Sequence, residues 1–594
     1  MTRQEALLRL LRKEVSHPTL LQFDFENDEE LFSPELDRAR LNLKQGSYEI
    51  AYNQLKELQS QEPLANKQQH IQSIIFRCLE GIENLFLIAS IAQLREDLML
   101  YRQHDYQDGR GIRRLCIKLL HFRYNNEGEI YSLEQIAADE FLLDCLANDF
   151  YPDPHVEKFL TDIRRQLLLS SIQKEEINED YLPLYQALAL QGYLTEYVFS
   201  YREDEEAVVR GLNEDLGHLL GEDECELTDI SNMLLLLAMY RPLFLTNAYP
   251  ALEGLETQQL PEFLQNIFAL TYLEVSDLNR KLIQVITLGE IQGQAKTEAS
   301  LRDSTIFPRY SRLRLAESKG SYINRYPEIS ASAGIAELVS KDPLEILVAD
   351  CSTGFNALEI ADSCRGASVT AVDLSKTRLA YAKRIKSAYN ISNIEFFQSD
   401  IKELPNVFKA QKQRFHIIDA WESFGGYVSI DDTVQSLLQL LKPDGLLRIG
   451  LKSRRANRHL VKLRGLVAKL GIRQDSRYLR DFRTQILHRE LGPDLLPVLG
   501  NREFYSMSGC RDLFFGSSRN LVTIPQIKSL LHRNRLEFLG FEFFSDDMNQ
   551  EYSRLFPADK NRLNLDYWHQ LEQQIPDAFR YGYRFHCRRV SSQQ

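Results

Sequence analysis

The stretch that decides the fold covers residues 344–373 and reads LEILVADCSTGFNALEIADSCRGASVTAVD. An apolar strand ends at a tight turn with a single glycine, Gly354; a helix follows, and a second strand ends at Asp373. In such a unit the N–H groups of the turn and the helix N-terminus face a polar ligand. An acid about twenty residues further on accepts the hydroxyls of a ribose. The stretch therefore predicts half of a nucleotide-cofactor site.

The turn contains only one of the three glycines that a dinucleotide requires in the pattern GxGxxG. Asp350 and Ser352 stand where smaller residues would let a pyrophosphate approach. The turn therefore argues against a dinucleotide. On these residues alone, an ordinary strand–helix–strand crossover without a ligand stays an open alternative.

Length and charge set the first limits on the protein. A chain of 594 residues is too long for one hydrophobic core and predicts about three domains. The formal net charge of −13 argues against general electrostatic binding to nucleic acid, although it says nothing of a local basic patch.

Eight cysteines are scattered without a CxxC pair or a Cys/His cluster, so neither a metal site nor a disulfide framework is predicted. The first residues, MTRQEALLRLLRKEV, lack the apolar core of a signal peptide. The longest apolar run, residues 233–240, is too short for a membrane span. We therefore expect a cytoplasmic protein without membrane insertion.

Apolar residues recur at helical spacing from the N-terminus to about residue 290. We predict an all-helical region over 1–130 and a helical middle domain over 131–295. Residues 39–58, ARLNLKQGSYEIAYNQLKEL, look like one helix-pair repeat unit without a second copy. Small and polar residues predict a linker and lead-in helix over 296–342.

The pattern then changes to alternating strands and helices, which is typical of a doubly wound parallel sheet. A long excursion follows the fifth strand, and a late helix and two further strands predict a closing antiparallel hairpin. The predicted cofactor domain covers 343–594, with a helical insertion at about 452–522. Its strands are expected at 345–348, 369–372, 394–397, 416–420, 446–451, 536–543 and 581–589.

In this order, the elements resemble the class I S-adenosylmethionine-dependent methyltransferases. The resemblance rests on five segments: DCSTGFN (350–356), VTAVDLS (369–375), IEFFQSDIKEL (394–404), FHIIDAWESFGG (415–426) and LLKPDGLLRIGL (440–451). It implies a seven-stranded Rossmann-like α/β domain and S-adenosyl-L-methionine as the cofactor.

The resemblance also implies a role for each residue of the pocket. The turn would hold the methionine portion, Asp373 the ribose hydroxyls, and Leu374 one face of the adenine. Asp400 and Ile401 would contact the adenine from the next strand. The expected cofactor-binding residues are Asp350, Ser352, Thr353, Gly354, Asp373, Leu374, Asp400, Ile401 and Asp419.

A narrower resemblance covers roughly residues 140 to 588. LQGYLTEYVF (190–199), REFYSMSGCRDLFF (502–515) and LDYWHQLEQQIPDAFRYGYRF (565–585) are similar to bacterial methyltransferases with a helical, tetratricopeptide-like N-terminal half. Rickettsial outer-membrane-protein lysine methyltransferases share this layout. The resemblance implies a protein substrate, lysine methylation and a homodimer.

The turn departs from the relatives' GCGTG, because Asp350 and Ser352 replace two glycines. Where such a position needs a positive φ, a side chain costs on the order of 1 kcal/mol. One interpretation is that Asp350 pairs instead with the methionine ammonium. Gly425 and Gly426 stand where relatives often carry paired histidines, so no acid–base role is expected of that pair.

Methyl transfer from a sulfonium mainly requires the nucleophile, methyl and sulfur to be held in line. Asp419 ends the fourth strand and is the first candidate for the acceptor side, with Tyr427 as the second catalytic candidate. Trp421, Glu422 and Phe424 lie in the same loop, where packing is the simpler interpretation.

Eleven lysines and arginines lie between Lys452 and Arg483, with few acids among them. They suit RNA, an acidic protein surface or the chain's own acidic helical half. Leucines interleaved at helical spacing favour a packed amphipathic helix, so nucleic acid is the weaker interpretation. The competing functions are a degenerate scaffold and a methyltransferase acting on a small molecule or RNA.

Overall fold

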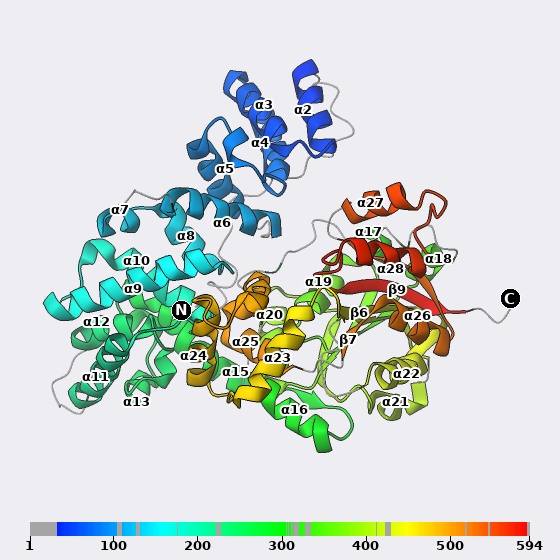
Figure 1. The fold of residues 1–594 in the computed structure, drawn as a ribbon. Helices are drawn as coiled ribbons and strands as arrows, with labels where there is room; N and C mark the ends of the chain where they lie inside the picture. The colour runs from blue at the N-terminus through cyan, green and yellow to red at the C-terminus, as the bar shows by residue number, and fades with distance from the viewer. Residues whose placement is uncertain are drawn as a thin grey trace. The chain divides into compact units, whose positions relative to one another are not determined.

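The computed structural model describes residues 33–103, 110–125, 131–174, 176–220, 227–303, 306, 308–310, 313, 320–326, 329, 334–411, 413–421, 429–516, 520–543 and 547–590. The chain forms two compact units, Met1–Glu274 and Val275–Gln594. Figure 1 colours the first from blue into green and the second from green to red. Each unit is described separately.

The regular elements in the described part of the first unit are all helices, as predicted. The first described helices form the expected helix pair: α2 has Pro34 at its start, and Ser33 accepts the Leu36 N–H. Gly46, with φ of +77°, lies between α2 and α3. The helices of this unit are α2 (Pro34–Lys44), α3 (Tyr48–Gln61), α4 (Ala65–Leu79), α5 (Ile91–Gln103), α6 (Arg110–Tyr124), α7 (Leu133–Ala137), α8 (Glu140–Asn148), α9 (Pro154–Lys174), α10 (Leu182–Leu194), α11 (Glu203–Leu219), α12 (Leu227–Ala238), α13 (Tyr249–Leu252) and α14 (Glu262–Phe268).

The second unit is built on one mixed sheet, in the order β1-β4-β3-β2-β5-β6-β9-β8 with β7 paired to β6. β1 to β6 pair in parallel, whereas β9 pairs antiparallel to both β6 and β8. The predicted parallel sheet with its closing antiparallel hairpin is confirmed. The strands are β1 (Ile286–Thr287), β2 (Leu344–Ala349), β3 (Ala367–Asp373), β4 (Ile394–Gln398), β5 (Phe415–Ala420), β6 (Leu441–Ser453), β7 (Leu521–Val522), β8 (Leu536–Phe541) and β9 (Tyr583–Arg589).

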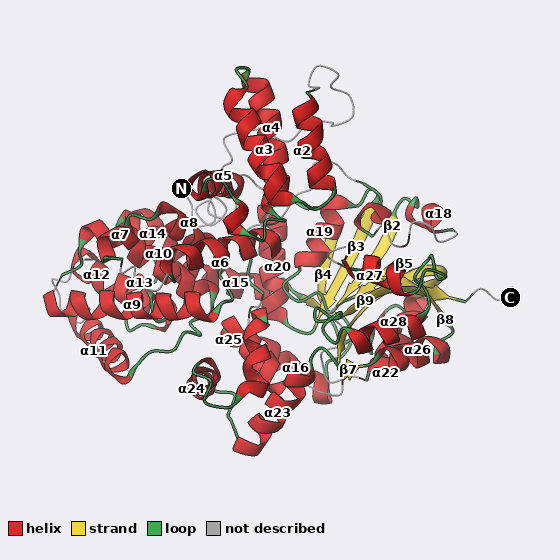
Figure 2. Ribbon diagram, turned by 45° about the horizontal axis from the view of Figure 1, so that its top comes forward, coloured by secondary structure: helices red, strands yellow, loops and turns green. Residues whose placement is uncertain are grey.

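Helices surround the sheet of this unit, drawn yellow in Figure 2. α19 and α20 contact β3 and β4, and α26 contacts β8. The helices are α15 (Glu274–Leu282), which begins at the last residue of the first unit, α16 (Gly293–Asp303), α17 (Tyr322–Arg325), α18 (Ile335–Val339), α19 (Phe355–Ser363), α20 (Lys376–Ala388), α21 (Leu404–Val407), α22 (Ile430–Leu440), α23 (Arg458–Leu470), α24 (Ser476–Leu487), α25 (Met507–Phe515), α26 (Ile524–Arg533), α27 (Asp547–Leu555) and α28 (Leu565–Gln574).

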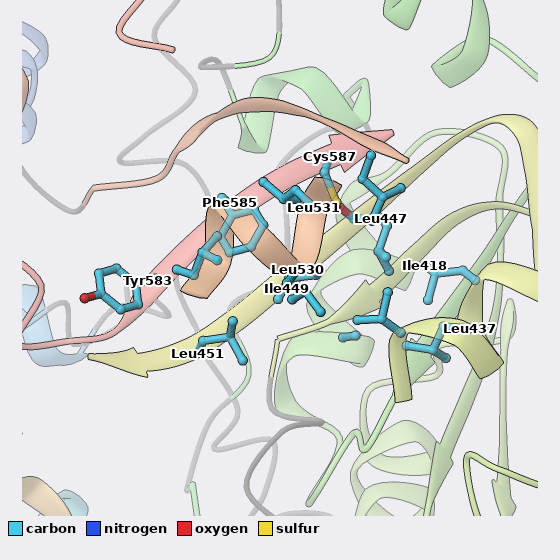
Figure 3. Packing of buried hydrophobic residues seen from close by; sticks show 14 of the residues in the cluster. Ile418, Leu437, Leu447, Ile449, Leu451, Leu530, Leu531, Tyr583, Phe585 and Cys587 are labelled. Carbon is cyan, nitrogen blue, oxygen red and sulfur yellow. The ribbon is translucent and has the colours of Figure 1, made fainter. Parts of the chain in front are cut away.

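A large hydrophobic cluster of this unit lies on one face of β5, β6 and β9. Leu447 and Ile449 of β6 and Phe585 of β9 meet Leu437 of α22 and Leu530 of α26 in one buried cluster (Figure 3). Successive side chains of a strand point to opposite faces of the sheet. The intervening residues of the same strands therefore face the other side, where the charged residues described below are found.

The excursion after β6 forms α23 to α25. α23 buries Leu460, Leu463 and Val467, as its predicted amphipathic pattern requires. The basic stripe is not uniformly external, because Arg483 is fully buried. Its Nε donates to the carbonyl oxygen of Phe504 over 2.7 Å. Among the described residues, no helix is long and apolar enough to cross a membrane.

Candidate cofactor-binding site

The turn between β2 and α19 has positive φ angles at two residues that are not glycine, and this conformation is energetically unfavourable. Asp350 and Ser352 both have φ of +53°, and Gly354 has φ of +85°. A non-glycine residue in this left-handed region costs roughly 1–2 kcal/mol, and such strain concentrates at functional sites. The two positions where relatives carry glycine therefore do need a positive φ here.

Gly354 is required by packing as well as by conformation. A Cβ at this position would lie 2.6 Å from the Cβ of Ala382 and 3.2 Å from the ring of Phe396. The beginning of α19 thus rests directly on α20 and β4. The neighbouring Thr353 is buried, and its hydroxyl donates to the Pro308 carbonyl over 2.8 Å. The Thr353 carbonyl oxygen in turn accepts from the Tyr310 hydroxyl over 2.8 Å, so both groups are engaged within the chain.

Asp373 lies at the end of β3 and is 1% exposed. Its Oδ2 accepts the Ser352 N–H over 2.9 Å, and its Oδ1 accepts the Ser375 N–H over 2.8 Å. Burial alone would raise the pKa of Asp373, but Arg302 and Arg378 outweigh that effect and lower it. The carboxylate is thus fixed and ionised, and each oxygen can still accept a further hydrogen bond.

Arg302 of α16 lies close to the carboxyl groups of Asp350 and Asp373. Its Nη1 donates to Asp350 and lies 3.9 Å from Oδ2 of Asp373. Its Nε donates to Glu298 over 2.9 Å. Burial raises the pKa of Asp350 to about 7, with Arg302 opposing the rise and Asp373 adding to it. Arg302 thus lies beside two buried carboxyl groups, Asp350 and Asp373, that also interact directly with each other.

The residues expected around the adenine lie beside this cluster. Leu374 is 6% exposed and packs against Ala295 and Ala299 of α16. Asp400 follows β4, and its Oδ1 accepts the Lys402 N–H over 3.0 Å. Ile401 packs against the large core cluster. Leu374 and Asp400 therefore follow neighbouring strands, β3 and β4, at their carboxyl ends.

Asp419 belongs to a separate buried ion-pair network on the other side of β2. Its Oδ2 accepts from Arg448 Nη1 over 2.8 Å and from Asn356 Nδ2 over 3.1 Å. Arg448 also donates to both carboxylate oxygens of Glu542, over 2.7 and 2.8 Å. Oδ1 of Asp419 accepts the Trp421 N–H over 3.1 Å. Asp419 therefore fixes the start of the loop after β5.

Tyr427 falls outside the described residues, as do Glu422, Phe424 and the pair Gly425 and Gly426. The structure therefore places Asp419 but not the second catalytic candidate. Among the described residues, no group of His, Cys, Asp and Glu side chains is arranged to hold a metal ion.

Three contributors to the site were not predicted. Arg448 does have a sequence signal, since it is a single cation inside the apolar strand LLRIGL. Asn356 follows the turn directly but carries no distinguishing pattern. Arg302 lies 48 positions before its partner Asp350, within the predicted linker and lead-in helix. Only the tertiary structure brings these two charges together.

Asp350 and Asp400 thus follow β2 and β4, and Asp373 ends β3, at the edge of the sheet where open α/β folds bind ligands. Residues 346–445 match the family described as "Methyltransferase domain". The sheet order and this match define a class I S-adenosylmethionine-dependent methyltransferase domain in the second unit. S-adenosylmethionine is the cofactor of this class.

Curated relatives are similar to this segment. Malonyl-[acyl-carrier protein] O-methyltransferase of Acetivibrio thermocellus is 32% identical over 111 residues, which is 19% of this chain and 36% of that protein. The enzyme of the same name from Halalkalibacterium halodurans is 34% identical over 106 residues, 18% of this chain and 38% of that protein. The chain thus spans little more than a third of the length of these relatives.

A solved structure, that of PKMT2 from Rickettsia typhi in complex with AdoHcy, is also similar to this chain. The alignment covers 42% of this chain and 49% of that one. The sequence identity is 17%, with a TM-score of 0.31.

Proposed function

We propose that the protein transfers methyl groups from S-adenosylmethionine to a protein, at lysine. The single observation that carries the reaction class is the buried Asp373 at the end of β3, inside the matched methyltransferase segment. Backbone N–H groups hold both of its oxygens. A ribose is the ligand that such a carboxylate suits at this position.

In this proposal the turn from Asp350 to Gly354 holds the methionine portion. Leu374 and Ile401 contact the adenine, and Asp400 accepts a hydrogen bond at its edge. S-adenosylmethionine supplies a methyl group on a positively charged sulfur. The chain's part is to orient the acceptor nitrogen and to exclude water, since in-line displacement requires little else.

For the acceptor side we propose a positioning role for Asp419 and a contact role for Tyr427. Asp419 is fully buried, and it accepts hydrogen bonds from Arg448 and Asn356. It fixes Trp421 and therefore the beginning of the loop that contains Tyr427. A lysine acceptor must lose its proton, which burial and a positively charged neighbour favour by lowering its pKa.

The large helical unit supports a macromolecular acceptor, because a small substrate does not need one. The curated relatives are named for the O-methylation of malonyl-[acyl-carrier protein]. Methylation of a carboxyl group is therefore the second candidate. The two candidates differ in the acceptor atom, which is nitrogen for lysine and oxygen for a carboxyl group.

Calorimetric titration with S-adenosylmethionine and S-adenosylhomocysteine tests the cofactor. We expect binding by the wild type and a loss of about tenfold to hundredfold in Asp373→Ala, because charged hydrogen bonds are removed. Asp444→Ala, which removes an exposed acid of the same unit, is the control and should bind normally. Absence of binding at millimolar cofactor would leave only the degenerate scaffold.

Incorporation of radiolabelled methyl groups into a cell lysate tests the acceptor. We expect label that protease releases and ribonuclease does not, and that survives mild alkali, since N-methyl groups are stable and methyl esters hydrolyse. Alkali-labile label would establish the carboxyl alternative. Label released by ribonuclease would establish RNA, and label found only in small molecules would exclude both protein acceptors.

A further inference from the structure

The helix α23, drawn yellow in Figure 1, carries a row of exposed cations. Residues 452–473 contain eight lysines and arginines and no acid. Three of the eight are Arg458, Lys462 and Lys469 of α23, which we call the basic row. Their helical spacing places them on one side of α23, and the opposite side is apolar and buried. The basic row therefore faces solvent along about 16 Å of helix.

The stability of the fold does not account for the basic row. Arg458 pairs with Asp577 over 3.5 Å and Lys462 with Asp494 over 2.9 Å, and all four side chains are more than half exposed. Ion pairs as exposed as these contribute little, whereas like charges on one side of a helix repel one another. By contrast, Arg483 of the same excursion is buried and donates to a backbone carbonyl oxygen. The basic row therefore indicates a partner outside the fold.

α23 begins at the edge of the sheet that the proposed function assigns to methyl transfer. Residues 454–457 join it to the end of β6. β6 pairs in parallel with β5, the strand that carries Asp419. The carboxyl ends of these two strands therefore share one edge, which is the ligand-binding edge of an open α/β fold. A protein bound along α23 would thus lie next to the proposed acceptor side.

The surroundings of the basic row favour a protein over a nucleic acid. Val461 and Leu470 adjoin cations of the row in sequence, and they are 40% and 51% exposed. Burial against another protein stabilises such aliphatic side chains, whereas a phosphate backbone has no apolar surface to cover them. Proteins that bind single-stranded nucleic acid also use aromatic side chains for stacking, and α23 contains no Phe, Tyr or Trp.

We propose that the basic row docks an acidic segment of the protein that accepts the methyl group, with carboxylates of that segment on Arg458, Lys462 and Lys469. This inference rests on the proposed function. The carboxylates of Asp494 and Asp577 give way to those of the partner at little cost, because exposed ion pairs are weak. Complementary charge of this kind speeds association and fixes the orientation of the partner.

Binding of a synthetic peptide tests the docking surface. The probe is a fluorescent helical peptide with glutamates along one side, at the spacing of the basic row, and leucines beside them. A scrambled peptide of the same composition is its control. We expect the wild type to bind the patterned peptide, less tightly as salt is added. The triple variant Arg458→Gln, Lys462→Gln, Lys469→Gln should bind it about tenfold more weakly.

The matched control is the triple variant Lys528→Gln, Arg533→Gln, Arg554→Gln. It removes the same charge from exposed residues of α26 and α27 in the same unit. This variant should bind the patterned peptide like the wild type. Unchanged thermal denaturation shows that both triple variants are folded.

Inhibition of methyl transfer tests whether the partner is the methyl acceptor. The patterned peptide should reduce the incorporation of radiolabelled methyl groups into lysate protein, and the scrambled peptide should not. The basic-row variant should need more lysate for half-maximal labelling but reach the same maximal rate, because the row does not touch the reacting atoms. Its affinity for S-adenosylhomocysteine should equal that of the wild type.

Three results would overturn the docking surface while leaving the proposed function intact. One is a patterned peptide that the wild type binds no better than the basic-row variant does. Another is a peptide that binds at the row without reducing the labelling. The third is polyuridylic acid that binds more tightly than the peptide and is lost in the basic-row variant, which would assign the row to RNA. Failure of the wild type to bind S-adenosylhomocysteine or to label any protein would instead refute the proposed function.

Discussion

Arg448 connects two carboxylates that are otherwise sealed inside the second unit. Asp419 is fully buried, and the side chain of Glu542 is 12% exposed. Burial would raise the pKa of Glu542, but Arg448 outweighs it and the pKa is lowered. Arg448 is therefore the chief cation that keeps Glu542 ionised, with His586 and Arg584 contributing, and it is also the ion-pair partner of Asp419.

We expect Arg448→Met to lower the free energy of unfolding by about 3–5 kcal/mol, because it leaves buried charges uncompensated. Urea denaturation measures the change. The matched control is Arg588→Met, which breaks an ion pair of 2.8 Å with the more exposed Glu537 and should cost less than about 1 kcal/mol. Equal losses in the two variants would contradict the role assigned to Arg448.

The raised pKa of Asp350 predicts a pH dependence of stability. Between its ordinary value of 3.8 and its folded value of about 7, the folded chain keeps a proton that the unfolded chain releases. The free energy of unfolding should therefore fall as pH rises through this window. Above about pH 7 this contribution should be constant.

Denaturation curves of the wild type and Asp350→Asn, taken from pH 4 to 8 without cofactor, isolate the effect. The wild type should lose stability relative to the variant up to about pH 7, because asparagine does not titrate. A difference that is constant with pH would show that Asp350 is ionised throughout.

At the scale of the elements, the junction of β2, α19 and α20 depends on Gly354. Gly354 starts α19 in the left-handed region, and an added Cβ would overlap Ala382. We expect Gly354→Ala to cost about 1–2 kcal/mol from its φ alone, plus an overpacking cost of about 1–3 kcal/mol.

Thermal denaturation of Gly354→Ala measures this cost. Gly465→Ala is the control, because this glycine lies within α23 and a Cβ there meets nothing within 4 Å. It should be neutral or stabilise α23, since alanine is the better helix former. A stable Gly354→Ala would mean that α19 can shift away from α20 without penalty.

Long elements could be predicted from pattern, whereas the shortest could not. All seven predicted strands are present in the sheet. β1 and β7 were missed because two residues are too few to show an alternating pattern. β1 pairs with β4 through Ile286 and Thr287, which are exposed, so hydrophobicity gave no signal either.

At the scale of the whole molecule, the two units carry net charges of opposite sign, which the net charge of the chain does not show. Residues 1–274 contain 24 basic and 48 acidic residues, whereas residues 275–594 contain 47 and 36. The methyltransferase unit is therefore basic, by 11 charges, although the chain is acidic. The net charge of the whole chain therefore does not argue against an anionic partner of this unit. For this reason the assay for the methyl acceptor includes ribonuclease treatment.

The two compact units predict two unfolding transitions in calorimetry. S-adenosylhomocysteine should shift only the transition of the second unit, because a ligand stabilises the part that binds it. At a hundredfold excess over Kd the shift corresponds to about 2.7 kcal/mol. A single transition that shifts as a whole would show that the units unfold together.

The sequence by itself determined the class of fold and placed Asp373 at the carboxyl edge of the sheet. Strand periodicity is a local property, and the carboxyl ends of parallel strands share one edge, so the position of Asp373 followed from the order of the elements. The turn was located by the same reasoning, whereas Asp400 was singled out by the resemblance to class I methyltransferases.

Only the tertiary structure decided which charges meet. Arg302 and Asp350 are 48 positions apart, and Arg448 and Glu542 are 94 apart. A pair of this kind leaves no periodic trace in one sequence, because its distance depends on how whole helices and strands pack. The sequence could not show whether Asp350 has a positive φ. Only the tertiary structure shows that it does.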